Sequence, residues 1–211
     1  MIDRHVLPLL GRVLQPLAGG LVRLGATADA ITGVGLVCGL AAAGLIASGN
    51  YAAGLAAFIA NRLCDGIDGA MARRLGPTDR GAFIDIAWDF IVYAALPFGF
   101  ALADPAANAL SAVALLFGFM GTASSFLAFA IIAAKRGLTS AAYPTKGIYY
   151  LGGLTEGGET IGFFVVVCLW PGWFAPLAWG FAGLCGLTTV TRWVEGIAAF
   201  TPSPPAPPPG D

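Results

Sequence analysis

DGIDGAMARRLGPTDRGAFIDIAWD, residues 65–89, brings four regularly spaced aspartates, Asp65, Asp68, Asp85 and Asp89, into a strongly apolar chain. The chain has 211 residues, of which 57% are hydrophobic and only 11% are charged. About a quarter of the residues are charged in an average soluble domain, so this is the composition of an integral membrane protein. Acidic groups inside membrane spans are costly and mark functional sites by default. The aspartates of this stretch are therefore the first candidates for chemistry.

The sequence contains six apolar runs long enough to cross the roughly 30 Å hydrocarbon core of a bilayer. They cover residues 30–48, 51–75, 82–103, 107–134, 147–170 and 174–198, and the second is the least apolar. Short breaks with Gly, Pro or Asn separate them, and none alternates like a barrel strand. Because backbone polar groups in lipid must be satisfied within a segment, we expect an all-α membrane domain over residues 29–200 with six transmembrane helices.

The two ends of the chain have different compositions from the spans. Residues 1–28 mix a Leu/Val stripe with spaced arginines, which predicts an amphipathic helix lying on the cytoplasmic membrane interface. Residues 201–211, TPSPPAPPPGD, are rich in proline and predict a disordered tail. No small-residue cleavage site follows a compact apolar stretch, so we do not expect a cleaved signal peptide.

Basic residues cluster in alternate connections of the predicted topology. They precede the first span or lie in the loops after the second and fourth spans: Arg4, Arg12, Arg23, Arg73, Arg74, Arg80, Lys135, Arg136 and Lys146. Arg62 and Arg192 lie inside spans two and six, towards the same side. The positive-inside rule then places both termini and the acid-rich loop in the cytoplasm.

The quoted stretch forms two helical faces. The second span carries on one face Asp65, Asp68, Gly69, Ala72 and Arg73, at i, i+3, i+4, i+7 and i+8. The third span carries Gly81, Asp85 and Asp89 at every fourth position. Only seven residues, RLGPTDR, connect the two runs, so the helices should be antiparallel neighbours. We therefore expect the four carboxylates to converge at one depth.

Such a cluster requires positive charge, since neighbouring like charges in a span disfavour ionisation. Four carboxylates carry the charge of two divalent ions, and hard oxygen ligands favour Mg²⁺ or Mn²⁺. Two such ions would clamp a diphosphate for in-line displacement, with Gly69 and Gly81 leaving room and Arg73 donating to phosphate. The only histidine, His5, lies in the N-terminal segment, so any base within the membrane domain must be a carboxylate.

Other interpretations of the same residues stay open. Intramembrane acids can form a cation or proton pathway, or can pair with arginines as a packing device. The acids of spans two and three gather near the cytoplasmic side, and spans one and four hold no charged residue in their interiors, which disfavours a path through the membrane. The four cysteines lack the spacing of a metal or redox motif and fall in apolar spans, so we interpret them as packing residues: Cys38, Cys64, Cys168 and Cys185.

The aspartate pattern, D-x-x-D-G-x-x-A-R followed by G-x-x-x-D-x-x-x-D, resembles the signature of the CDP-alcohol phosphatidyltransferases. The matching positions are Asp65, Asp68, Gly69, Ala72, Arg73, Gly81, Asp85 and Asp89. Seven residues separate Arg73 from Gly81, where eight are usual in the family. The stretch KGIYYLGGLTEGGET, residues 146–160, is similar to a bacterial inner-membrane branch of the family.

The resemblance implies a reaction and a role for each residue. A small alcohol attacks the β-phosphorus of CDP-diacylglycerol, CMP leaves and a phosphodiester lipid forms at the cytoplasmic face of the inner membrane. Asp65, Asp68 and Asp85 would be the principal metal ligands, and Asp89 the general base that also touches the second metal. The CDP part would be held by Gly69, Ala72, Arg73 and Gly81. The resemblance also implies a homodimer in the lipid bilayer, and no nucleic-acid partner is expected.

The acceptor alcohol is left open by the sequence. Glu156 lies about ten residues into the predicted span 147–170, with Glu159 one turn deeper, and Arg192 lies at comparable depth in the last span. A Glu156–Arg192 ion pair is one interpretation of these residues, and binding of acceptor groups is the other. Arg192 and Lys146 would favour a phosphorylated acceptor such as glycerol phosphate or inositol phosphate, whereas the glutamates would favour an amino alcohol such as serine.

Overall fold

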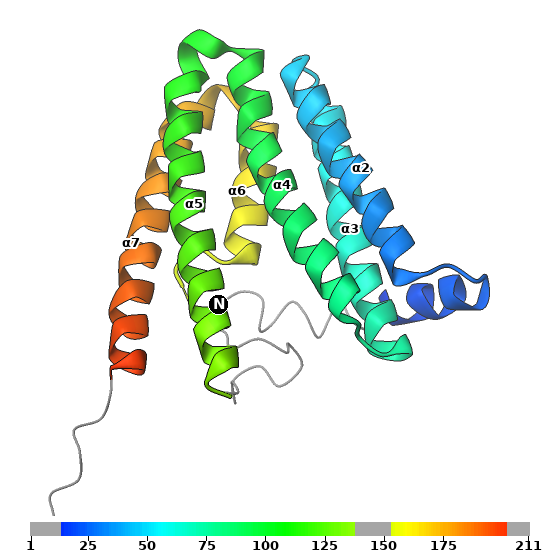
Figure 1. The fold of residues 1–211 in the computed structure, drawn as a ribbon. Helices are drawn as coiled ribbons and strands as arrows, with labels where there is room; N and C mark the ends of the chain where they lie inside the picture. Colours follow the sequence, from blue (N-terminus) through cyan, green and yellow to red (C-terminus); the bar gives the residue numbers. More distant parts are fainter. Residues whose placement is uncertain (1–13, 138–152, 202–211) are drawn as a thin grey trace, which may run out of the picture.

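The computed structural model describes residues 14–137 and 153–201, and within these ranges the chain is helical with no strand (Figure 1). A helical segment covers residues 14–23. The other elements are α2 Ala28–Ala47, α3 Tyr51–Leu75, α4 Asp79–Ala103, α5 Pro105–Lys135, α6 Gly157–Leu169, η1 Pro171–Trp173 and α7 Phe174–Phe200. The predicted all-α class is confirmed.

Short side chains at the helix starts explain where the first helices begin. Thr27, Asn50, Thr78 and Asp104 each accept a hydrogen bond from a backbone N–H three residues further on, which satisfies a donor that the helix cannot pair. Gly76 follows α3 with φ +95°, a left-handed conformation that glycine adopts at little cost. The connection between α3 and α4 is therefore only residues 76–78.

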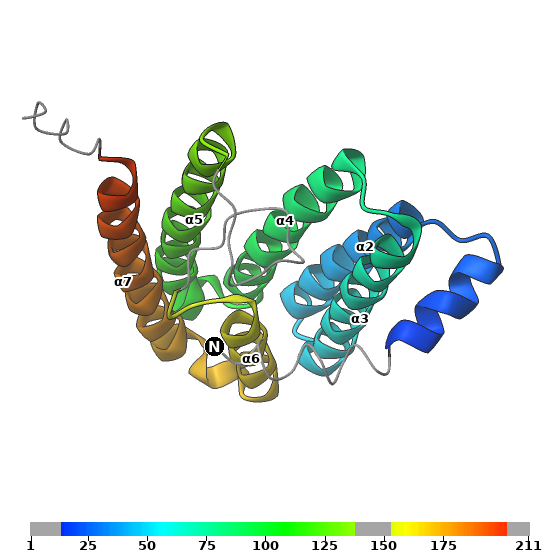
Figure 2. The same cartoon turned by 90° about the horizontal axis from the view of Figure 1, so that it is seen from below.

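The helices form a layered bundle in which α2 packs against both α3 and α4 (Figure 2). Helix α4 also packs on α5, α5 on α7, and α6 on α3. Aromatic side chains fill the centre, where Phe100 stacks on Phe174 with ring centroids 4.3 Å apart and Phe58 meets Phe164 edge-on at 5.6 Å. The acid-rich ends of α3 and α4 lie next to α2. This arrangement positions the site described below.

Four helical stretches of the described chain are long and apolar enough to cross a membrane: Ala28–Ala47, Asp79–Ala103, Pro105–Lys135 and Pro171–Phe200. Helix α3 coincides with the predicted span 51–75 and runs alongside α2, although its charged residues make it more polar (Figure 1). This is a multi-pass membrane protein. The number of spans, predicted as six, is not fixed by the described residues.

The predicted fifth span differs from the structure. Of residues 147–170, the structure describes 153–170, and in this part only Gly157–Leu169 is an α-helix, whose 13 residues extend about 20 Å at 1.5 Å per residue. Residue 156, which the sequence placed inside the span, has extended backbone with ψ −174°. The glycines on both sides weaken helical propensity there, so the apolar window overestimated the length of the helix. Residues 147–152 lie outside the described residues.

The helical segment 14–23 lies crosswise to α2 and α3 (Figure 1). Its Leu14 and Ala18 are buried against Ala70 and Met71 of α3. A Cβ at Gly66 would stand 2.6 Å from Leu14 Cδ1, so the Leu14 side chain rests on the backbone of α3. The location of this segment at a membrane interface stays a prediction. The remaining predicted features at residues 1–13, including His5, at Lys146 and in the tail 202–211 lie outside the described residues.

A close approach between the backbones of α2 and α4 gives a stability test. A Cβ at Gly99 would stand 2.6 Å from the Ala43 carbonyl oxygen, a backbone atom that cannot rotate away. We expect Gly99→Ala to lower the free energy of unfolding by about 1–3 kcal/mol through overpacking, measured as a lower thermal midpoint of the purified protein in detergent. Gly44→Ala in α2 is the matched control, because no heavy atom lies within 4 Å of a Cβ there. Equal midpoints for the two variants would contradict this packing.

Candidate active site

A pocket opens where α2, α3 and α4 converge, and it contains all four aspartates of the quoted stretch. Its lining consists of Thr32, Gly35, Leu36, Asn61, Arg62, Asp65, Asp68, Asp85, Trp88, Asp89 and Val92. The helical faces predicted for residues 65–89 therefore do meet. The contribution of α2 through Thr32 and Gly35 was not predicted, because no local pattern in residues 28–47 indicates which helices they will face.

Asp65, Asp68 and Asp85 form the most compact group in the pocket. One carboxylate oxygen from each lies within 4.8 Å of the others. Asp68 is buried, and its Oδ2 atom has no hydrogen-bond partner within the part of the chain that the structure describes. A buried carboxylate oxygen without a partner is costly, and a hard divalent cation would satisfy it together with the two neighbouring oxygens. These three residues, called the triad below, fit a Mg²⁺ or Mn²⁺ ion.

Local structure explains how the triad assembles. Asp65 and Asp68 are three residues apart on α3 and so share one face. Thr78 caps α4 directly after the three-residue connection, which places Asp85 near the start of the antiparallel helix. Asn61 Nδ2 donates to the Gly35 carbonyl at 2.9 Å, and this buried hydrogen bond fixes α3 to α2. The three carboxylates of the triad thus lie at one depth on α3 and α4, and α2 helps to hold α3 in place.

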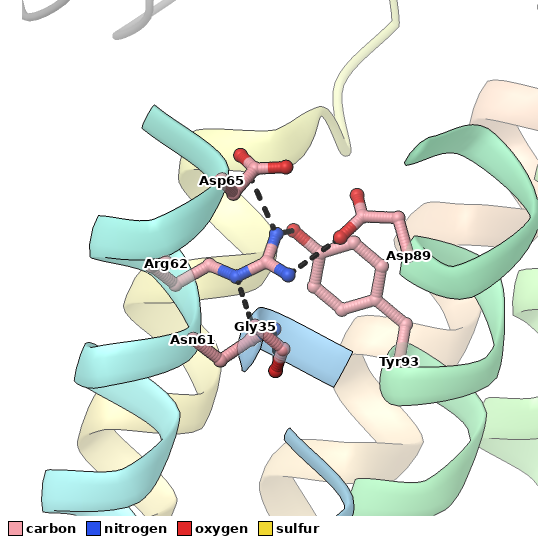
Figure 3. A network of polar contacts seen from close by, with 6 residues as sticks. All are labelled: Gly35, Asn61, Arg62, Asp65, Asp89 and Tyr93. Carbon is pink, nitrogen blue, oxygen red and sulfur yellow. Dashed lines mark hydrogen bonds and ion pairs between the residues drawn. The ribbon is translucent and has the colours of Figure 1, made fainter. Parts of the chain in front are cut away.

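Asp89 follows Asp85 by one turn of α4. Its carboxylate points towards Arg62 (Figure 3). Arg62 Nη2 donates to Asp89 Oδ1 at 2.5 Å, and Arg62 Nη1 donates to the Tyr93 hydroxyl at 3.0 Å. Arg62 Nη1 also lies 4.0 Å from Asp65 Oδ2. In the sequence, Arg62 contributed only to the prediction of the membrane orientation of the chain. Its position one helical turn before Asp65 was the available signal that it faces the carboxylates.

The residues predicted to hold the CDP part lie towards the α3–α4 connection. Gly69, Ala72 and Arg73 follow Asp68 along α3, and Arg73 is exposed. At Gly81 a Cβ would stand 3.4 Å from Asp29 Oδ1 of α2, so Asp29 also belongs to this surface. Asp29 Oδ2 pairs with Arg80 Nε at 3.4 Å. Sequence reasoning did not select Asp29, since it lies far from the aspartate stretch along the chain.

Glu156, Glu159 and Arg192 occupy a second polar cluster between α5, α6 and α7. The expectation that Glu156 lies ten residues inside a span was wrong, because Glu156 directly precedes α6, where the Glu159 carboxylate accepts its N–H at 3.1 Å. Glu156 Oε1 accepts the Gly153 N–H at 3.0 Å. Arg192 is buried in α7 and donates from Nη1 to the Thr122 carbonyl at 3.0 Å. The signal missed in the sequence is the Glu-x-x-Glu spacing of a helix start.

Comparison with known proteins identifies a matching family and two relatives. Residues 26–193 match the family model described as CDP-alcohol phosphatidyltransferase. The inner membrane protein YnjF of Escherichia coli K12 is 51% identical over 196 residues, which cover 93% of this chain and 95% of YnjF. The phosphatidylinositol phosphate synthase of Streptomyces avermitilis is 35% identical over 105 residues, covering 48% of this chain and 43% of that protein.

Solved structures share the fold. The phosphatidylinositol phosphate synthase PgsA1 of Mycobacterium tuberculosis with CDP-DAG bound has a TM-score of 0.71 at 24% identity, covering 92% of this chain and 99% of that one. The same enzyme in complex with manganese and citrate has a TM-score of 0.69 at 25% identity, with coverage of 90% and 93%. The helical arrangement of Figure 1 is therefore the fold of that enzyme.

The triad predicts a metal-binding defect. Asp68→Asn should weaken Mn²⁺ binding at least about tenfold, because it replaces the buried anionic ligand by a neutral amide. Binding is measured by electron paramagnetic resonance of free Mn²⁺ during titration of the purified protein. Asp79→Asn makes the same charge change at an exposed position in the first turn of α4 and should leave the affinity unchanged. An Asp68→Asn protein that binds Mn²⁺ as tightly as the wild type would argue against the triad.

Proposed function

We infer the reaction from the premise that the chain belongs to the CDP-alcohol phosphatidyltransferase family, as the family match and the relative with 51% identity show. It is an enzyme, a membrane-embedded transferase of phospholipid synthesis. We propose that it moves a phosphatidyl group from CDP-diacylglycerol to the hydroxyl of a small alcohol and releases CMP. The observation that carries the proposal is the assembly of Asp65, Asp68 and Asp85 in one pocket.

Two divalent ions, Mg²⁺ or Mn²⁺, are the proposed cofactors. The charge of four carboxylates supports that number, and a structural neighbour was solved with manganese. Asp65, Asp68 and Asp85 would hold the ions, with Asp89 contributing to the second. When bound, the ions would supply positive charge that neutralises the diphosphate and the leaving CMP. Metal charge and positioning should provide most of the rate, because transfers at phosphorus need little covalent help from protein.

The protein residues act on the two substrates in different ways. The acceptor oxygen forms a bond to the β-phosphorus of the donor while the bond from that phosphorus to the CMP oxygen breaks. Asp89 would accept the proton of the acceptor hydroxyl at a carboxylate oxygen. The CDP part would be held by Gly69, Ala72, Arg73 and Gly81, with the Arg73 guanidinium donating to a phosphate oxygen.

The acceptor is proposed only as a small alcohol. Relatives named phosphatidylinositol phosphate synthase make inositol phosphate the first candidate. Arg192 is the buried cation of the described residues outside the aspartate pocket, and it would suit a phosphorylated alcohol. Glu156 and Glu159 would suit an amino alcohol such as serine. We further propose that the protein lies in the bacterial inner membrane, as the name of the relative YnjF suggests. We also propose that it forms a homodimer and that both termini and the pocket lie on the cytoplasmic side.

The proposed function is tested by CMP release from CDP-diacylglycerol with Mg²⁺, using glycerol 3-phosphate, inositol 1-phosphate, inositol and serine as acceptors. One acceptor should give release, and Asp89→Asn should lower its rate about 10²–10⁴-fold, as expected for loss of a general base. Asp79→Asn, on the same helix but exposed, should stay within about twofold of the wild type. Full activity in Asp89→Asn would remove the base from the mechanism.

Metal removal gives an independent prediction. Chelation with EDTA should abolish acceptor-dependent CMP release, and addition of Mg²⁺ or Mn²⁺ should restore it, because without the ions the negatively charged diphosphate would enter a pocket lined by four carboxylates. Release is measured before chelation, after it and after the metal is returned. Activity that persists in the chelated protein would exclude metal-dependent transfer.

A further inference from the structure

Arg62 is a charged residue of the pocket that the proposed mechanism does not use. It lies within α3, one turn before Asp65, and its side chain is only 10% exposed. It is not among the positions of the aspartate motif. A permanently charged guanidinium at this depth contributes one positive charge directly beside the carboxylates.

The guanidinium is held from several sides (Figure 3). Besides its bonds to Asp89 and Tyr93, Arg62 donates from Nε to Asn61 Oδ1 at 2.7 Å. Its central carbon lies 4.9 Å from the centre of the Tyr93 ring, which adds a cation–π contact. Asn61 is itself bonded to the Gly35 carbonyl of α2. The position of the charge is thus fixed by contacts with α3 and α4, and through Asn61 by α2.

This fixed charge changes the electrostatics of the pocket. The four carboxylates carry four negative charges, and the Arg62 guanidinium offsets one of them. The guanidinium contacts Asp89 and lies 4.0 Å from Asp65, so it stands between the deeper carboxylate and the triad. A second divalent ion near Asp89 would be placed next to this charge and repelled by it, while an ion bound within the triad alone would be repelled less.

We propose that Arg62 is a positioning residue that keeps Asp89 apart from the triad and restricts the substrate-free site to one divalent ion. The proposal rests on the proposed function of the site. Arg62 orients the Asp89 carboxylate through a charge-assisted hydrogen bond and takes the place of a second cation beside it. A diphosphate entering the pocket offers the guanidinium another anionic partner, so a second ion binds only together with the donor substrate.

The test counts Mn²⁺ ions bound to the purified protein without substrate, by electron paramagnetic resonance titration. The wild type should bind one ion. Arg62→Met and Arg62→Gln, which remove the charge, should bind a second ion or bind Mn²⁺ at least about tenfold more tightly. Arg62→Lys should remain at one ion because it keeps the charge. Arg62→Met combined with Asp89→Asn should return to one ion, since the carboxylate that attracts the second one is gone.

The controls separate this role from a merely structural one. A structural role predicts weaker Mn²⁺ binding and a lower thermal midpoint in all Arg62 variants, Lys included, and that result would overturn the proposal. Arg192→Met removes a buried arginine of α7 and should leave the number of ions at one. Two ions in the substrate-free wild type, or unchanged binding in both neutral Arg62 variants, would also overturn it.

The same titration distinguishes failure of this inference from failure of the proposed function. A wild type that binds no Mn²⁺, or one ion that Asp68→Asn does not lose, removes the metal site and with it both proposals. One ion that requires Asp68, with no change on neutralising Arg62, overturns the role of Arg62 alone and leaves the transferase proposal standing.

Discussion

Mutual repulsion of carboxylates inside an apolar helical bundle is the constraint on which this structure depends. In a medium of low dielectric constant, neighbouring negative charges are stable only with positive charge close by or with polar groups directed at them. One carboxylate oxygen of each of Asp65, Asp68 and Asp85 lies within 4.8 Å of the others, and Asp89 pairs with the Arg62 guanidinium. The pocket is therefore built to receive cations, and its protein scaffold must hold the carboxylates together before any cation arrives.

Helix α2 supplies much of that scaffold although it contributes none of the four aspartates. It packs against both α3 and α4, and the buried Asn61–Gly35 hydrogen bond ties it to the turn that precedes Asp65. Close contact with α4 is possible because Gly99 has no side chain at the Ala43 carbonyl. The short, capped connection after Gly76 limits how far the acidic ends of α3 and α4 can separate. Small residues and helix caps thus stabilise the close approach of the acidic helix ends, which electrostatic repulsion opposes.

How much of this structure the sequence predicts depends on how far apart the interacting residues lie along the chain. The bounds of α3 and the shared faces of Asp65 with Asp68 come from helical periodicity, a local property, and these predictions agree with the structure. The Arg62–Asp89 pair and the contact of Asp29 with Gly81 join separate helices, so spacing along the chain does not reveal them. Glu156 was misplaced because a hydropathy window averages over the helix start that it precedes.

Leu14 rests on Gly66, and Gly66 directly follows Asp65. The crosswise segment 14–23, predicted to lie on the membrane surface, therefore bears on the backbone beside a proposed metal ligand. A displacement of that segment towards α3 would press the Leu14 side chain against the backbone next to Asp65, because the two are already in contact. With the segment on the membrane surface, a change in membrane thickness or curvature that moved it would also bear on the backbone that carries a proposed metal ligand.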